Sequence, residues 1–144
     1  AYDLQAEGCI DPSHSAQVFI RTEMTKCGYN IFYAMDAVNM DMKELARQLK
    51  AIVGDMPVYI TFDIDALDPS AAPGTGTPVI GGPTSAQARR LLYELRGINV
   101  VAADLVEVLP HMTTARSPHL RRQRSHRTLC ILCIIKIKSR ISSP

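Results

Sequence analysis

The chain has 144 residues, of which 47% are hydrophobic, and its formal net charge is +2 at neutral pH. This length fits one domain, and the composition is that of an ordinary globular protein. The sequence has no run of eighteen apolar residues and no basic segment followed by an apolar core, which argues against a transmembrane helix and a signal peptide. The four cysteines are therefore expected to stay reduced in a cytoplasm.

Charge is divided unevenly along the chain. All fourteen acidic residues precede Pro110, whereas residues 111–144 contain eight Lys or Arg residues and no acid. Such an asymmetry normally indicates a basic arm that binds nucleic acid or a membrane surface. Because the two parts differ in chemistry, we divide the chain into residues 1–110 and a basic tail, residues 111–144.

Two short strands and a helix are expected first. Segments 16–21 and 29–34 are apolar and contain β-branched and aromatic residues, which predicts strands. Asp41 is suited to cap a helix, with Glu44 three residues later as in a capping box, and Gly54 is suited to end it. Between these residues runs an apolar stripe at helical spacing, formed by Met42, Leu45, Ala46, Leu49, Ile52 and Val53.

The segment 58–69 is the most informative one. Residues 58–62 form a short apolar run, which predicts a strand covered on both faces, as in the parallel sheets of α/β proteins. Asp63 and Asp65 follow two residues apart, so an extended backbone would point both carboxylates to one side. A divalent cation would remove their repulsion. The alternative is a turn in which Asp63, Asp65 and Asp68 cap the backbone.

A second helix and a last strand follow. Thr84 is expected to cap a helix over residues 85–96, and segment 98–108 is expected to form another buried strand, which contains Asp104 and Glu107. The buried stripe of the helix consists of Ala88, Leu91, Leu92 and Leu95. Strands that alternate with helices predict β-α-β units, a mostly parallel sheet and the α/β fold class.

Glycine, threonine and proline residues follow the acidic segment in a fixed order. Asp-Ile-Asp-Ala-Leu-Asp-Pro at 63–69 precedes Pro-Gly-Thr-Gly-Thr-Pro at 73–78 and a Gly-Gly pair at 81–82. This series resembles the signature of the ureohydrolases, the family of agmatinase, arginase and formiminoglutamase, and residues 7–12 and 56–59 are most similar to the agmatinase branch. The resemblance covers residues 7–110. It implies the C-terminal part of a three-layer arginase-like fold, truncated at the N-terminus.

The resemblance also implies roles for particular residues. Asp63 and Asp65 match ligands of a two-manganese site, Glu107 matches the residue that contacts the substrate guanidinium, and Thr77 matches the threonine that supports it. Asp104 is expected to support the site from behind. Intact members of the agmatinase branch are homo-oligomers that hydrolyse agmatine to putrescine and urea, by attack of metal-bound hydroxide on the guanidinium carbon.

Three further family motifs are absent from the sequence. Gly-Gly-Asp-His, Asp-Ala-His-x-Asp and His-Gly-Thr carry the other metal ligands and a catalytic histidine in the family, and none of the four histidines here stands in such a context. Two carboxylates attract an ion weakly and cannot enclose two, so we expect the chain alone to be inactive. It is then an inert gene remnant or a piece that pairs with an N-terminal fragment. Phe19 is a further departure, because the family usually has a glycine there, which puts close packing at that position in doubt.

The tail, residues 111–144, lacks the family pattern and is expected to be disordered or to come from a shifted reading frame. If plausible codons are written for the tail and read one nucleotide earlier, the translated sequence is similar to the helix that follows at this point in the family. The alternatives are phosphate binding by the Arg cluster at 121–124 and half a zinc site at Cys130 and Cys133, but no aromatic platform or second cysteine pair accompanies them. Nucleic acid is thus an improbable partner. Removing the tail is expected to leave the fold unchanged.

Overall fold

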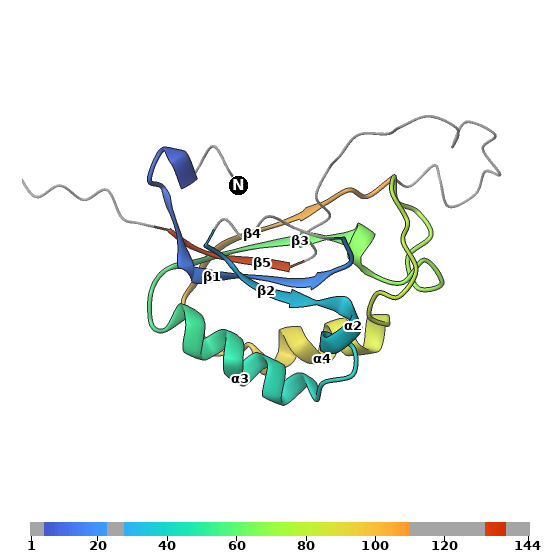
Figure 1. The fold of residues 1–144 in the computed structure, drawn as a ribbon, viewed down its shortest axis with the longest axis horizontal. Coiled ribbons are helices and arrows are strands. Elements are labelled where there is room, and N and C mark those ends of the chain that lie inside the picture. Colours follow the sequence, from blue (N-terminus) through green and yellow to red (C-terminus); the bar gives the residue numbers. More distant parts are fainter. Residues whose placement is uncertain (1–4, 23–27, 110–131, 138–144) are drawn as a thin grey trace, which may run out of the picture.

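The computed structural model describes residues 5–22, 28–109 and 132–137 (Figure 1). In chain order its elements are β1 (Ile10–Ile20), β2 (Asn30–Tyr33), α2 (Ala34–Ala37), α3 (Met42–Val53), β3 (Val58–Asp63), the 3-10 helix η1 (Ile64–Ala66), α4 (Ser85–Glu94), β4 (Val100–Val106) and β5 (Leu132–Ile137). Among the described elements, no helix has the length and apolar character that crossing a membrane requires. Among the described elements β2 follows β1 directly, and helices lie between β2 and β3 and between β3 and β4, which confirms the α/β class predicted from the sequence.

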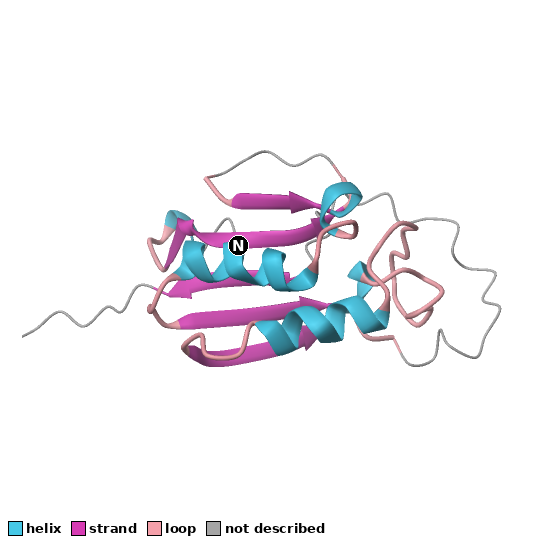
Figure 2. Cartoon of the chain, turned by 90° about the horizontal axis from the view of Figure 1, so that it is seen from below, coloured by secondary structure: helices cyan, strands magenta, loops and turns pink. Residues whose placement is uncertain are grey.

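The five strands form one sheet in the order β2-β1-β5-β3-β4 (Figure 2). β1 is parallel to β2, and β3 is parallel to β4, as expected for β-α-β units. β5 lies between β1 and β3 and is antiparallel to both, so the other four strands all run in one direction. Their carboxyl ends therefore meet at one edge of the sheet, where α/β proteins place their ligands.

Helices α3 and α4 begin at the predicted residues. The carboxylate of Asp41 accepts hydrogen bonds from the backbone N–H groups of Lys43 at 2.9 Å and Glu44 at 3.2 Å. Thr84 and Gln87 form a complete capping box at the start of α4. Apart from Ile52 and Leu92, the apolar stripes of both helices are buried and contribute to the core together with β1 and Val58: Met42, Leu45, Ala46, Leu49, Val53, Leu91 and Leu95. Local capping and helical periodicity therefore decide where the covering layer lies.

The helices cover only one face of the sheet (Figure 1). The described residues thus form two of the three layers of the expected arginase-like fold. β4 was predicted to be buried, but it is the edge strand and Leu105 is 60% exposed, because nothing in the described part of the chain covers its outer side. Leu92 of α4 is also exposed rather than buried, because it points about 100° away from Leu91 around the helix.

β5 corrects the expectation for the tail. Residues 132–137, with the sequence Leu-Cys-Ile-Ile-Lys-Ile, form a strand at the centre of the sheet and do not lie outside the fold. Its branched apolar residues favour a strand, and the facing edges of β1 and β3 supply backbone partners on both sides. The Arg cluster at 121–124 and Cys130 lie outside the described residues.

Phe19 occupies a bulge near the end of β1. The pairing of β1 with β2 shifts by one residue between Val18 and Ile20, and Phe19 between them has a φ of 59°. The phenyl ring is nevertheless 1% exposed and belongs to the core. A side chain in this left-handed region costs about 1–2 kcal/mol, which glycine avoids. The close packing that the sequence placed in doubt is therefore present, at the cost of a strained backbone.

Candidate metal and substrate site

The acidic segment turns as soon as β3 ends. Asp63 is the cap of η1, and its Oδ1 accepts a hydrogen bond from the backbone N–H of Asp65 at 2.9 Å. Asp65 consequently lies in a 3-10 turn, which corrects the expectation that an extended backbone points both carboxylates to one side. Asp68 caps the next turn by accepting hydrogen bonds from the N–H and hydroxyl of Ser70. Asp63 and Asp68 thus cap turns, whereas the carboxylate of Asp65 caps none and acts on Asp63 through its charge.

Asp65 is the most buried acid of the segment, with 1% of its surface exposed. Its Oδ2 accepts a hydrogen bond from the hydroxyl of Thr77, in the Gly-Thr-Gly-Thr loop. Its Oδ1 is buried and has no hydrogen-bond partner among the described residues. An unpaired carboxylate oxygen in the interior is costly unless a cation or a donor approaches it. This oxygen is therefore suited to ligate a metal ion.

Asp63 is half-buried, and its pKa is raised from the usual 3.8 to about 6, chiefly by burial. The negative charges of Asp65 and Glu107 contribute to this rise, whereas the N–H of Asp65 and the charge of Arg21 act in the opposite direction. Three carboxylates from the ends of two neighbouring strands thus repel one another here. A divalent cation would reverse the effect of burial and repulsion.

Arg21 is the residue that the sequence analysis missed. It follows β1, and its guanidinium donates hydrogen bonds to the backbone carbonyls of Asp65 and Val79. Burial lowers the pKa of Arg21, while the charges of Asp65, Asp63 and Asp68 raise it. Arg21 therefore ties the end of β1 to the acidic turn and supplies one positive charge beside it. The only signal in the sequence was a cation directly after an apolar strand.

Glu107 lies directly after β4 and is exposed, with a φ of 60°. The Gly-Thr-Gly-Thr loop passes close to it, since a Cβ on Gly76 would lie at an ordinary contact distance of 3.9 Å from the Glu107 carboxylate. A backbone bridge between Thr75 and Val108 holds loop and strand together. The structure thus brings Glu107 into the charge environment of Asp63, on the side from which Thr77 contacts Asp65.

Asp104 lies in the middle of β4, opposite Thr61. Its carboxylate accepts a hydrogen bond of 2.5 Å from the hydroxyl of Tyr59, and this bond raises the pKa of the tyrosine. The described residues include no hydrogen bond from Asp104 to Asp63, Asp65 or Glu107. The expected supporting role of Asp104 therefore stays a prediction.

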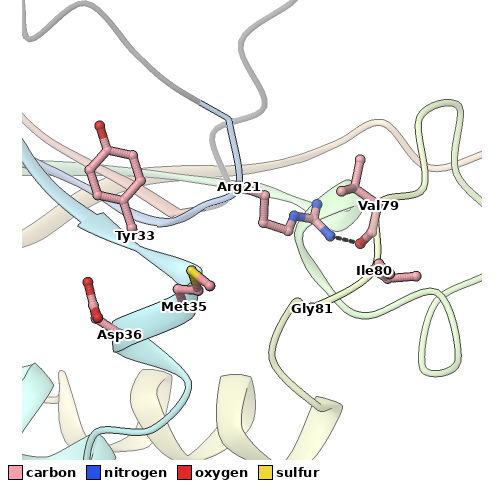
Figure 3. Close-up of a pocket in the computed structure, with 7 residues that line it drawn as sticks. All are labelled: Arg21, Tyr33, Met35, Asp36, Val79, Ile80 and Gly81. Carbon is pink, nitrogen blue, oxygen red and sulfur yellow. Dashed lines mark hydrogen bonds between the residues drawn. The ribbon is translucent and has the colours of Figure 1, made fainter.

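A cavity of about 420 Å³ opens beside Arg21 at the same edge of the sheet. Figure 3 shows the Arg21 guanidinium directed at Val79, with Met35 and Asp36 on the other side of the opening. The full lining consists of Arg21, Tyr33, Met35, Asp36, Val79, Ile80 and Gly81. Next to it, Gly82 lies so close to the Ala66 carbonyl that a Cβ would approach this oxygen to 2.1 Å. Glycine at this position therefore lets the loop close over the acidic turn.

The donor set fits part of a metal site. Asp63 and Asp65 offer hard oxygen ligands, one of them buried and unpaired, which suit manganese or another divalent cation. Within residues 5–22, 28–109 and 132–137, no three His, Cys, Asp or Glu side chains are grouped as a metal centre requires. The two aspartates alone would leave most coordination positions to water.

Known proteins are similar to this chain in sequence and in fold. The sequence pattern described as the Arginase family matches residues 2–128, which extends past Pro110. An agmatinase of Escherichia coli O1:K1 is 52% identical to this chain over 110 residues, which cover 76% of this chain and 36% of the agmatinase. The crystal structure of a hypothetical agmatinase from Burkholderia thailandensis has a TM-score of 0.75 and 45% identity, covering 77% of this chain and 35% of its own. Proclavaminate amidino hydrolase from Streptomyces clavuligerus has a TM-score of 0.72 and 31% identity, covering 77% of this chain and 40% of its own. The chain thus spans about a third of the length of these relatives.

Proposed function

The chain belongs to the arginase family, and on this premise we propose that it forms the metal- and substrate-binding part of an agmatinase-like ureohydrolase. The observation that carries the proposal is the buried Asp65 carboxylate, which has one unpaired oxygen and lies beside Asp63 at the edge where four parallel strands end. Because the chain spans 36% of the curated agmatinases, the activity of the whole enzyme is part of the proposal.

Asp63 and Asp65 are the residues that would hold manganese. Manganese held there would supply a nucleophile near neutral pH and polarise the bond to be broken. Thr77 holds one oxygen of Asp65 and leaves the other free for a ligand bond. Arg21 fixes the turn through the Asp65 carbonyl, so that both carboxylates keep their places when the metal is absent.

Glu107 would bind the substrate guanidinium. A carboxylate can accept two parallel N–H donors from a guanidinium, and this pairing sets the position of the carbon to be attacked. Glu107 is exposed and lies within the charge field of Asp63, as a residue that orients substrate above the metals must. The substrate that fits the relatives is agmatine, with putrescine and urea as products.

A second candidate is that this chain has no catalytic activity of its own. The observation in its favour is that the described residues contain no group of three metal-binding side chains. In this case the chain contributes two ligands and the substrate carboxylate, and the remaining ligands come from elsewhere in a homo-oligomeric enzyme of the agmatinase kind.

Calorimetric titration of the whole chain with Mn²⁺ tests the metal assignment. We expect binding on the order of millimolar, because two carboxylates leave most positions to water, and loss of that binding in Asp65→Asn. Asp55→Asn, which removes an exposed acid from the loop after α3, is the matched control and should bind as the parent does. Equal binding by Asp65→Asn and the parent would contradict the assignment. Urea release from agmatine that is abolished in Asp63→Ala would exclude the second candidate.

A further inference from the structure

β4 is the last strand of the sheet, and its outer edge has no partner among the described strands (Figure 2). Such an edge presents backbone N–H and C=O groups that can pair with another chain. The strand at the opposite end, β2, has only four residues, all of them partly buried, whereas β4 has seven residues, six of them exposed. The edge at β4 is thus the longer and the more accessible of the two.

The exposed side chains of β4 are mostly apolar. Val101 is 55% exposed and Leu105 is 60% exposed. Leu105 pairs with Phe62, which packs against the core, so Leu105 and Val101 both lie on the side of the sheet that the helices cover. The strand contains no Lys, Arg or Pro to prevent pairing, and Asp104 is its only charged residue. A bulge at Val101 twists its start, which limits regular pairing to residues 101–105.

The sequence of β4 is complementary to itself in one antiparallel register. When Ala103 lies opposite Ala103 of a second copy, Val101 lies opposite Leu105 of that copy, and Ala102 lies opposite Asp104. Centring the pairing on Asp104 would set two carboxylates directly opposite each other, which is destabilising. Centring it on Ala102 would leave Leu105 outside the paired stretch. An axis between two residues would place the helices of the two copies on opposite faces of the sheet.

We propose that β4 pairs antiparallel with β4 of a second copy of this chain, about a two-fold axis between the two Ala103 residues, so that the two sheets become one. The symmetry makes the contact between Val101 and Leu105 occur twice. Asp104 keeps its hydrogen bond from Tyr59 on the open face of the sheet, and the two Asp104 carboxylates lie at diagonal positions about 7–8 Å apart. The proposal rests on the strand edge alone and is independent of the metal assignment.

An exchange of charges across the strand pair tests this register. Val101→Lys and Leu105→Glu should each weaken the dimer about tenfold, because each places two charges opposite apolar side chains. The double variant Val101→Lys/Leu105→Glu should recover most of the affinity, since opposite charges then face each other twice. The matched control is Val101→Lys/Ile80→Glu, which has the same net charge but carries the acid on a loop residue that is 83% exposed. It should dimerise as weakly as Val101→Lys alone.

Sedimentation equilibrium of the whole chain at several loading concentrations measures the association, and circular dichroism establishes that each variant folds as the parent does. One strand edge buries less surface than a standard interface, so we expect a dissociation constant on the order of micromolar or weaker. A parent that stays monomeric up to about 1 mM would overturn the proposal. A dimer that neither single variant weakens, or that the double variant does not restore, would overturn it as well.

Hydrogen exchange on the unmodified chain gives a test that needs no variant. The outward-facing amides of residues 101–105 should exchange more slowly as the concentration rises through the dissociation constant, whereas the amides of residues 30–33 in β2 should not respond. Protection of the β4 amides that is equal at every concentration would show that the same chain covers this edge, and the second copy would then be excluded as its partner. A response at β2 in place of β4 would place the contact at the other edge and overturn the proposal.

Discussion

Substitutions at Phe19 should reverse the usual order of alanine and glycine. At most strand positions glycine is less stable than alanine by about 0.5–1 kcal/mol, because it loses more backbone freedom on folding. At Phe19 the φ of 59° imposes a cost of about 1–2 kcal/mol on any side chain, and glycine alone avoids it. Phe19→Gly should therefore be more stable than Phe19→Ala by up to about 1.5 kcal/mol.

Both variants lose the buried ring, which is 1% exposed in the core, and each should be less stable than the parent by about 3 kcal/mol or more. The comparison between them cancels this shared loss. Val18 supplies the control, because it is equally buried in β1 and is not among the described residues with positive φ. Val18→Ala should be more stable than Val18→Gly.

Urea unfolding at low temperature, followed by circular dichroism, measures all four variants. The quantity that decides is the alanine-to-glycine difference at position 19 minus that at position 18, expected to be about 1–2 kcal/mol in favour of glycine at 19. If the alanine-to-glycine difference at position 19 equals that at position 18, the backbone at the bulge is not strained and the argument for a displaced family glycine fails.

Three further perturbations follow from the structure. Because the pKa of Asp63 is about 6 in the folded state and about 3.8 in the unfolded state, the folded state binds the proton more tightly, so stability should fall between these pH values as pH rises. Asp63→Asn should remove this fall and be more stable than the parent by about 1 kcal/mol at pH 7 in metal-free buffer, because solvent reduces the full shift at a half-exposed group. Parallel pH profiles of variant and parent in thermal unfolding would contradict this. Gly82→Ala should lower stability by about 2–4 kcal/mol in urea unfolding, since its Cβ would meet the Ala66 carbonyl at 2.1 Å, whereas Ser85→Ala at the exposed start of α4 should stay within about 0.5 kcal/mol. Deleting residues 132–144 should broaden thermal unfolding by leaving β1 and β3 without partners on their facing edges, and an unchanged transition would restore the expectation that the tail contributes nothing.

The helices could be predicted from the sequence because their signals are local. Asp41 and Thr84 cap α3 and α4 through bonds to residues two or three positions away, and the apolar stripes need no knowledge of partners. The position of the acidic turn could be predicted for the same reason, but its backbone conformation could not. The capping bond from the Asp65 N–H to Asp63 turns the backbone at once, and alternation of side chains along a strand no longer applies.

What the sequence could not provide depends on contacts between distant residues. Arg21 meets the carbonyls of Asp65 and Val79 only after β1 and β3 lie in one sheet. The exposure of β4 depends on its place at the edge, which the composition of segment 98–108 does not encode. β5 depends on an opening between two other strands. In each case the outcome depends on which strands and helices are neighbours in space, and patterns in a single sequence carry no such information.

The central place of β5 also sets the order in which the chain can fold during synthesis. Ile10, near the start of β1, pairs with Ile137, which the ribosome adds last among the described residues. At roughly 5–20 residues per second, the nascent β1 and β2 wait on the order of ten seconds for this partner. Closing a loop of this length is slow, and the exposed edges of β1 and β3 are available to other chains in the meantime. Yield from the ribosome should therefore be sensitive to chaperones that shield strand edges until translation reaches residue 137.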